Sequence, residues 1–181
     1  MKNLFRKEPA PRADRRKVAG LYGRVMAQAR QPFFFTQLGL PDSFETRFEL
    51  LFLHMFLVLG RLKTMEAARG LMQGLIEYMI DDLDRAFREA GIGDMGVAKR
   101  MKKLLPEFYG RLLAYETALA ASDEKEILRA LDRNLFAACD TNLQNLAIMR
   151  EYLLRQRAAL AAQPLEAFIE GKEVFAPGGL S

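Results

Sequence analysis

An unbroken apolar run, LLFLHMFLVLG from Leu50 to Gly60, constrains the fold of this chain more than any other segment. The run is far shorter than the ~20 residues that a helix needs to cross a bilayer, and it contains His54. A helix that is apolar on every side lies buried among other elements. The run therefore predicts a buried central helix, with His54 as a hydrogen-bonded core residue rather than a haem ligand.

The other apolar residues also recur at helical spacing, and no segment shows the alternation typical of strands. Leu, Ala, Arg, Glu and Met dominate the composition, which favours helix, and 181 residues fit one domain. We expect an all-α, single-domain bundle of six to eight helices around the helix Leu50–Leu62. The expected helical domain covers residues 14–175, between a flexible basic arm (1–13) and a flexible tail (176–181).

Local signals predict the helix boundaries. Side chains that cap helix starts are Asp14, Asp42 (with Glu45 as a capping box), Thr64, Asp94 and the segment Ser122 to Glu124. Helix ends are expected near Ala29, Lys63, Ala90, Ala138 and Ala161. Pro106 predicts a kink or a break, because proline cannot donate to the preceding turn. Further helices are expected from about Thr141 and after Pro164.

Positive charge is concentrated at the N-terminus. Residues 1–30 carry nine Lys/Arg against Glu8 and Asp14, whereas the whole chain has a net charge of only +4. One interpretation is a membrane-docking arm that binds the anionic cytoplasmic leaflet through Lys2, Leu4, Phe5, Arg6 and Lys7. A solvated tail is the alternative. No signal or transit peptide is recognisable, so we expect a cytoplasmic protein, peripheral on the inner membrane.

The segment DDLDRAFREAGIGDMGVAKRMKK, from Asp81 to Lys103, joins an acidic helix to a basic one. Gly91 is a natural helix stop, and Gly91 and Gly93 are predicted to shape the turn. The basic cluster consists of Lys99, Arg100, Lys102 and Lys103. A solvated helical face is the default interpretation, and a protein-binding surface is the sharper one. The cluster lacks the interleaved aromatics and helix-turn-helix register of a DNA-binding site, so no DNA partner is expected.

Catalytic and metal chemistry find little support. One histidine and one cysteine, His54 and Cys139, exclude zinc clusters and paired di-iron motifs. The triplet Asp81, Asp82 and Asp84 partly matches the DDxxD motif of helical isoprenoid synthases, but the fifth position is Arg85. Pairing of Asp81 with Arg85 and of Asp84 with Arg88 is the ordinary alternative. We expect no enzyme and no cofactor, and keep a helical prenyl-transferring or quinone-pathway enzyme as the alternative function.

Four segments, in order along the chain, resemble the ubiquinol–cytochrome c chaperones, which are assembly factors for respiratory complex III. They are QARQPFFFTQLGLPDSFETRFELLFLHMFLVLGRL (Gln28 to Leu62), MIDDLDRAFREAGIGDMGVAKRMKKL (Met79 to Leu104), FYGRLLAY (Phe108 to Tyr115) and LDRNLF (Leu131 to Phe136). The pattern D-x-D-x-x-x-R-E-x-G-x-G-D followed by a basic segment is the most specific part.

The resemblance implies a non-enzymatic chaperone that binds newly made cytochrome b and stabilises it before complex III assembles. Mitochondrial members act with a small partner protein near the ribosome. This chain lacks their presequence and long N-terminal extension, so it looks like a bacterial homologue. The partner protein and ribosome contact therefore stay open here.

The resemblance also points to particular residues. The signature turn matches at Asp82, Asp84, Arg88, Glu89, Gly91, Gly93 and Asp94, and the later motifs match at Lys99, Lys102, Tyr109, Gly110, Arg111, Tyr115, Arg133 and Asn134. The client- or partner-binding residues we predict are Asp82, Asp84, Arg88, Glu89, Asp94, Lys99, Lys102, Lys103, Tyr109 and Arg111. A packing role for Tyr109 to Arg111, with Arg111 tied to a carboxylate, is the alternative.

Overall fold

The computed structural model describes residues 13–121, 123–137, 139 and 142–177. Its elements are α1 (Arg15–Ala29), α2 (Phe33–Thr36), α3 (Phe44–Leu62), the 3₁₀-helix η1 (Glu66–Ala68), α4 (Arg69–Glu89), α5 (Asp94–Ala121), α6 (Glu124–Asn134), α7 (Leu143–Ala161) and α8 (Leu165–Ile169). None of the described residues is in a β-strand. The all-α prediction is confirmed.

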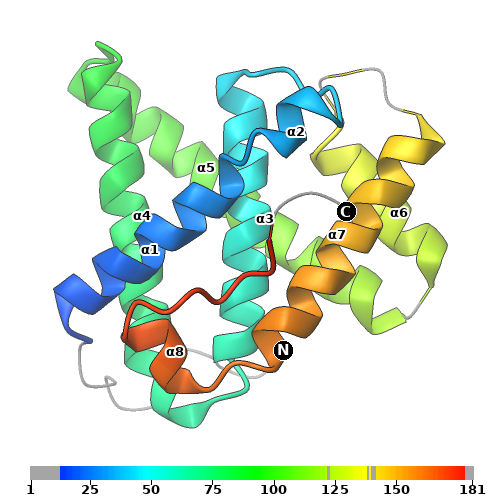
Figure 1. Ribbon diagram of the computed structural model, residues 1–181. Coiled ribbons are helices and arrows are strands. Elements are labelled where there is room, and N and C mark those ends of the chain that lie inside the picture. Colours follow the sequence, from blue (N-terminus) through cyan, green and yellow to red (C-terminus); the bar gives the residue numbers. More distant parts are fainter. Residues whose placement is uncertain (1–12, 122, 138, 140–141, 178–181) are drawn as a thin grey trace.

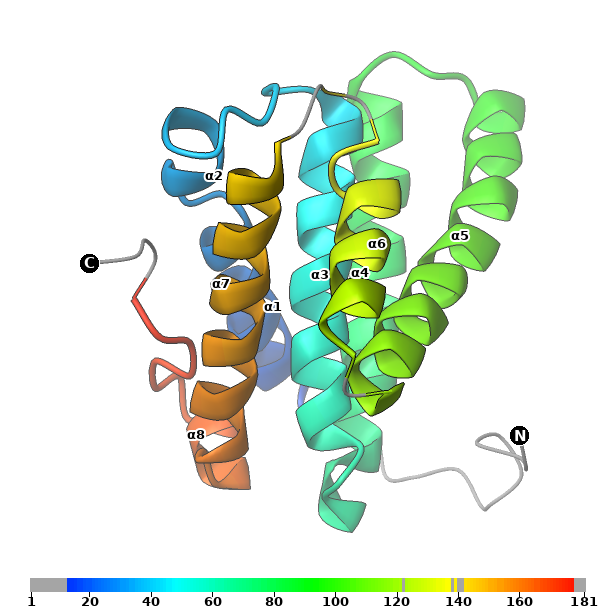
Figure 2. The same cartoon turned by 90° about the vertical axis from the view of Figure 1, so that its right-hand side faces the viewer.

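Helix α3 lies at the centre of the bundle (Figure 1). It packs against α1, α4, α5 and α7, and most of the predicted run, including Leu50, Leu53 and Met55, is fully buried. Figure 2 shows α1, α2, α7 and α8 on one side of α3 and α5 on the other. The predicted central helix is therefore correct.

A close approach between α1 and α4 depends on one glycine. A Cβ added at Gly74 would lie 2.9 Å from a methyl group of Val18, which is buried on α1. Real Cβ contacts are essentially never this short, so the small residue lets the two helices meet. This contact holds α1 closely against α4.

Two predicted caps are wrong. Ser43, not Asp42, caps α3, because the Ser43 side chain accepts from the Thr46 amide at 3.2 Å. Asp42 instead accepts two hydrogen bonds from Arg47. The helix predicted to start at Thr64 begins later, at η1 and then α4, and the Thr64 hydroxyl donates back to the Arg61 carbonyl.

Other boundaries differ as well. Helix α5 continues through Pro106 without a break and starts at Asp94 itself, one residue earlier than a cap at Asp94 requires. Helix α6 ends at Asn134 rather than near Ala138, and the Asn134 side chain donates to the Ala130 carbonyl. Helix α7 begins at Leu143, with Asn142 as its cap. The expected starts and ends at Thr141 and Ala138 themselves lie outside the described residues.

A polar network around His54 ties distant segments together inside the core. His54 Nδ1–H donates to the Leu50 carbonyl at 2.7 Å, so the neutral ring accepts from the Tyr152 hydroxyl at Nε2, at 2.6 Å. Gln28 donates to that hydroxyl and to the Ala176 carbonyl. Full burial lowers the pKa of His54 to about 4. The prediction of a hydrogen-bonded core histidine is confirmed.

Residues 173–177, the closing segment, pack over this network. Val174 and Phe175 are buried, and the Phe175 ring lies edge-on to His54. The Ala176 amide donates to Gln156, which donates back to the Ala176 carbonyl. The anchored chain thus runs past residue 175, where the sequence placed the end of the domain.

Candidate functional site

The turn between α4 and α5 has the geometry that its glycine predicts. Gly91 has φ +80°, and its amide donates to the Arg88 carbonyl while the Ile92 amide donates to the Phe87 carbonyl. These two bonds form a Schellman motif, which needs a left-handed residue at the position of Gly91. Gly93, by contrast, does not adopt positive φ. Helix α4 therefore ends, and the chain turns into α5, mainly at Gly91.

Arg88 joins the two helices of the hairpin. Its guanidinium binds Asp84 at 2.6 Å, one turn earlier on α4, and also binds Asp94 at the start of α5. The hydrogen bonds that Arg88 donates to both carboxylates raise its pKa further above its ordinary value. Because all three side chains are solvated, this contact fixes the hairpin geometry more than it stabilises the fold.

The acidic side of the hairpin faces α1. Asp82 accepts a hydrogen bond from the Tyr22 hydroxyl at 3.0 Å, and Asp81 lies 3.8 Å from Arg15 rather than pairing with Arg85 as expected. Burial and the neighbouring Asp82 raise the pKa of Tyr22. The three carboxylates of the partial DDxxD motif thus already have protein partners.

Basic and apolar side chains share the outer face of α5. The exposed residues Met95, Lys99, Lys102, Pro106, Tyr109 and Leu113 follow one another at steps of three or four, so they lie along one stripe, with Lys103 and Gly110 at its edge. Met95, Tyr109 and Leu113 are 90%, 44% and 54% exposed. The acidic and basic clusters, adjacent in sequence, therefore point to different sides of the hairpin.

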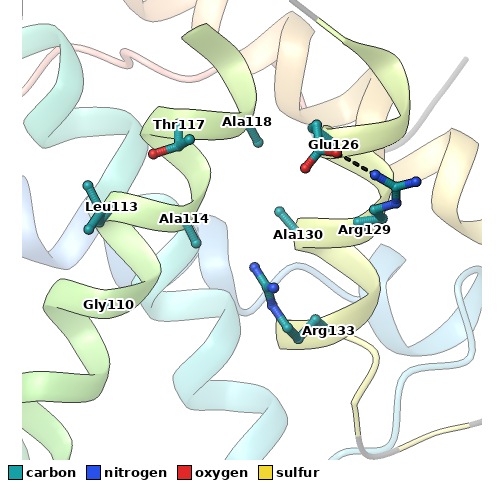
Figure 3. Close-up of a pocket in the computed structure, with 9 residues that line it drawn as sticks. All are labelled: Gly110, Leu113, Ala114, Thr117, Ala118, Glu126, Arg129, Ala130 and Arg133. Carbon is teal, nitrogen blue, oxygen red and sulfur yellow. Dashed lines mark hydrogen bonds and ion pairs between the residues drawn. The ribbon is translucent and has the colours of Figure 1, made fainter. Parts of the chain in front are cut away.

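A shallow groove of about 290 Å³ separates the second half of α5 from α6 (Figure 3). Small side chains form its floor, namely Ala114 and Ala118 of α5 and Ala130 of α6, and Figure 3 shows these three pointing into it. On the α6 side Arg129 is paired with Glu126, and the Arg133 side chain extends along the groove. Sequence reasoning missed this groove, although the spacing Gly110, Ala114, Ala118 was a usable signal.

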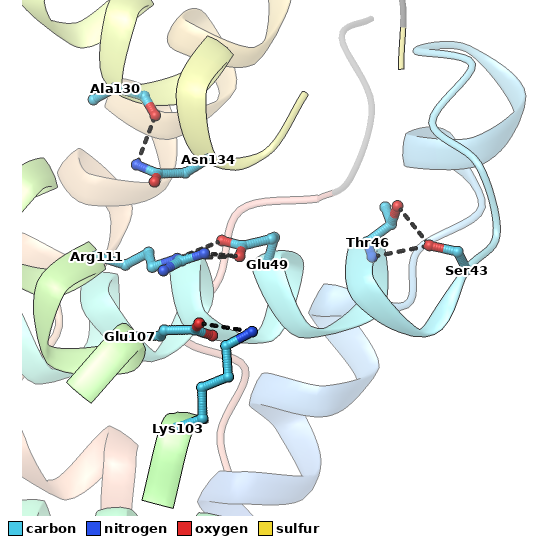
Figure 4. Close-up of polar contacts among 8 residues, drawn as sticks. All are labelled: Ser43, Thr46, Glu49, Lys103, Glu107, Arg111, Ala130 and Asn134. Atoms are coloured by element: carbon cyan, nitrogen blue, oxygen red, sulfur yellow. Dashed lines mark hydrogen bonds and ion pairs between the residues drawn. The ribbon is translucent and has the colours of Figure 1, made fainter. Parts of the chain in front are cut away.

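Arg111 has a structural partner (Figure 4). It forms a two-pronged ion pair with Glu49 of α3, with its Nη2 2.7 Å from Glu49 Oε1, and the two side chains are only 25% and 14% exposed. Burial raises the pKa of Glu49, while the hydrogen bond from Arg111 opposes that shift. The packing alternative for Arg111 is thus the one the geometry supports, since the contact fastens α5 to α3.

The predicted binding residues therefore fall into two groups. Asp82, Asp84, Arg88, Asp94 and Arg111 are engaged by partners within the protein. Glu89, Lys99, Lys102, Lys103 and Tyr109 are exposed, with Lys103 3.7 Å from Glu107. The predicted arm, Lys2 to Lys7, lies outside the described residues. No group of three or more His, Cys, Asp or Glu side chains in the described ranges is arranged to hold a metal.

A family model, ubiquinol–cytochrome c chaperone, matches residues 36–175 of this chain. The chain belongs to the ubiquinol–cytochrome c chaperone family. The match begins after Gln28 and ends after Phe136, the outer limits of the segments that showed the resemblance, so the family's region includes α7, α8 and most of the closing segment. Over the described residues, no helix of this family member combines the length and hydropathy that crossing a bilayer requires.

Relatives of this chaperone family support the assignment. The crystal structure of the Cbp3 homolog from Brucella abortus is 37% identical, covers 90% of each chain and superposes with a TM-score of 0.78. This likeness supports the expectation that the chain is a bacterial homologue. Protein CBP3, mitochondrial, from Saccharomyces cerevisiae is 26% identical over 82% of this chain and 45% of its own length. Ubiquinol-cytochrome c reductase complex assembly factor 1 of Mus musculus is 26% identical over 68% of this chain and 42% of its own length. The chain thus spans less than half of these two curated relatives.

Proposed function

We propose that this protein is a non-enzymatic assembly chaperone, which binds newly made cytochrome b and supports assembly of the ubiquinol–cytochrome c reductase complex. The family match over residues 36–175 carries the proposal. Relatives named as assembly factors of that complex, and a fold shared with the Brucella Cbp3 homolog, support it. We place the protein in the cytoplasm, at the inner membrane.

Client contacts are proposed on the surface that runs from the hairpin turn along α5 to the groove beside α6. This surface carries the exposed members of the predicted set, above all Glu89, Lys99, Lys102 and Tyr109. The engaged members hold it in shape: Arg88 fixes the turn and Arg111 fastens α5 to α3. A shaped polar rim beside a groove with a floor of small side chains suits recognition of helical segments.

Deletion of the gene in its host tests the function. We expect less assembled complex III and a weaker reduced-minus-oxidised spectrum of cytochrome b, both restored by the wild-type gene. Cytochrome oxidase is the control, because a specific chaperone leaves its spectrum unchanged. Normal complex III in the deletion strain would contradict the proposal, and equal loss of both complexes would indicate a general defect.

A further inference from the structure

The outer face of α5 combines features of a membrane-binding surface. Three of the five large hydrophobic side chains that are exposed among the described residues, Met95, Tyr109 and Leu113, lie on this one stripe. Lys99 and Lys102 lie between them, at the same helical face. The stripe from Met95 to Leu113 is about 27 Å long, at the rise of an α-helix.

The charge of this face is of one sign. The carboxylates of α5 are Asp94, Glu107 and Glu116, and each is held by a cation: Arg88, Lys103 and Lys63 respectively. Neither Lys99 nor Lys102 has an acidic residue beside it on the stripe. The face therefore presents uncompensated positive charge, which complements an anionic surface.

The shape of the face selects among anionic partners. Helix α5 forms one edge of the molecule (Figure 2), and the exposed residues of the stripe lie on its solvent-facing ridge, with Leu113 also lining the groove beside α6. A convex ridge contacts a flat surface along its whole length, whereas a single helix of a protein partner fits the neighbouring groove better. Lysine stems and tyrosine rings both suit a bilayer interface, because their apolar parts lie among the lipids while their polar ends stay in water.

We propose that the outer face of α5, through Met95, Lys99, Lys102, Lys103, Tyr109 and Leu113, docks this protein flat on an anionic phospholipid surface. The binding is weak and reversible, as expected for a few cations and a few apolar side chains. The inference refines the proposed function, because lipid headgroups then contact part of the surface assigned to client binding. Lipid binding itself needs no client.

Vesicle sedimentation of the purified full chain tests the inference. The protein is expected to bind vesicles of phosphatidylcholine and phosphatidylglycerol in equal parts, and to bind phosphatidylcholine vesicles much more weakly. Added salt should release it, because exposed charges are screened. Joint replacement Lys99→Glu, Lys102→Glu and Lys103→Glu should lower the binding constant about a hundredfold, since each lysine near anionic lipid contributes about fivefold.

The matched control makes the same change of net charge elsewhere: Lys17→Glu, Lys125→Glu and Arg157→Glu, all exposed and on α1, α6 and α7. It should retain binding within about threefold, since these positions lie off the docking face. Equal losses in the two triple variants, or no loss in the α5 variant, would overturn the proposal. Far-ultraviolet circular dichroism and melting curves confirm that both variants are folded.

A second pair of variants tests the apolar contribution without changing charge. Met95→Ser with Leu113→Ser should weaken vesicle binding about tenfold, whereas Leu143→Ser, which changes a side chain 79% exposed on α7, should not. Unchanged binding by the α5 double variant would show that no side chain enters the bilayer.

Capture of cytochrome b in detergent separates lipid binding from client binding. Without a bilayer, capture of cytochrome b by the lysine variant reports only the client contacts proposed for Lys99 and Lys102, and we expect it to fall, whereas vesicle binding of the pure protein reports only the lipid contacts. A variant that sediments normally with vesicles but loses cytochrome b in detergent would overturn the lipid assignment and leave the proposed function intact. Normal complex III after gene deletion would instead refute the proposed function and leave vesicle binding unaffected.

Discussion

Gly91 ends α4, as the sequence predicts, and it shapes the turn that belongs to the proposed binding surface. Its φ of +80° is a conformation that side chains with a Cβ rarely adopt. We expect Gly91→Ala to lower the free energy of unfolding by about 1 kcal/mol, measured by chemical denaturation. Gly60→Ala is the control, since a Cβ there meets open space on helix α3 and should gain a few tenths of a kcal/mol.

His54 gives the protein a specific dependence on pH. Its pKa of about 4 in the folded state lies below the ordinary value of 6.5, so the unfolded chain binds the proton more readily. Stability is full above pH 6.5 and falls as the pH drops towards 4, by about 3 kcal/mol from this group. Between pH 7 and pH 4.5 the free energy of unfolding, measured by chemical denaturation, should fall more in wild type than in His54→Gln. Equal falls in the two proteins would contradict the assignment.

At the residue scale, the structural role of a side chain can be predicted from sequence more reliably at positions that only one residue type suits. His54 had no ionisable neighbour in its apolar run, and Gly91 followed a helix whose end needed a left-handed residue. Asp42 and Ser43 are both good caps, one position apart, and a nearby side chain that pairs with one of them decides between them. Arg47 pairs with Asp42, and Ser43 therefore caps α3.

At the scale of elements, Pro106 is tolerated within α5 at a cost. Proline cannot donate to the carbonyl of Lys102, four residues earlier, yet the helix continues. Burial of Val97 before the proline, and of Phe108 and Tyr115 after it, holds both halves in line, and the Arg111–Glu49 pair fastens the second half to α3. Pro106→Ala should therefore raise the free energy of unfolding by about 1–3 kcal/mol in urea denaturation. A loss of stability would mean that the proline shapes a necessary bend.

The Arg88 contacts predict a local effect at the hairpin. Arg88→Ala removes the link between Asp84 and Asp94 and should speed amide hydrogen exchange from residue 88 to residue 97. Global stability should change little, because these side chains are solvated. Arg85→Ala, an exposed neighbour on α4, is the control and should leave exchange unchanged. Equal exchange in the two variants would show that the turn holds without Arg88.

The hairpin also shows what sequence leaves undetermined between elements. The order of acidic helix, glycine turn and basic helix could be predicted from the sequence, and so could the end of α4 at Gly91. Helical position, however, decides that Asp81 and Asp82 face α1 while Lys99 and Lys102 face outward. Charges adjacent along the chain therefore do not form one surface, and the groove between α5 and α6 depends on how two helices pack.

At the scale of the whole molecule, the closing segment should be required for stability. Ending the chain after Lys172 removes the buried Val174 and Phe175 and leaves Gln28 and Gln156 without their partner, Ala176. We expect a loss of at least about 4 kcal/mol, measured by thermal or urea denaturation. A chain that ends after Pro177 is the control, because it still contains Val174, Phe175 and Ala176. Wild-type stability of the shorter chain would refute this role.

The overall architecture was predictable because apolar periodicity determines both helix and buried face. The run around His54 identified α3 as the centre, and the family resemblance covered the hairpin. The closing segment was not predicted, since Val174 and Phe175 lie in irregular structure, where periodicity carries no signal. Some of its contacts are with residues more than a hundred positions away, such as Gln28 and His54, and others are with Gln156 of α7.

That separation has a consequence for synthesis of the protein. Gln28 and Ala176 are 148 residues apart, and His54 and Tyr152 are 98 apart, yet all four meet in one network. While residues near 176 are still inside the ribosome, the part already made cannot close its core. The apolar surface around His54 then stays open to water and to other proteins. We expect this protein, until its last contacts form, to depend on the cell's general chaperones.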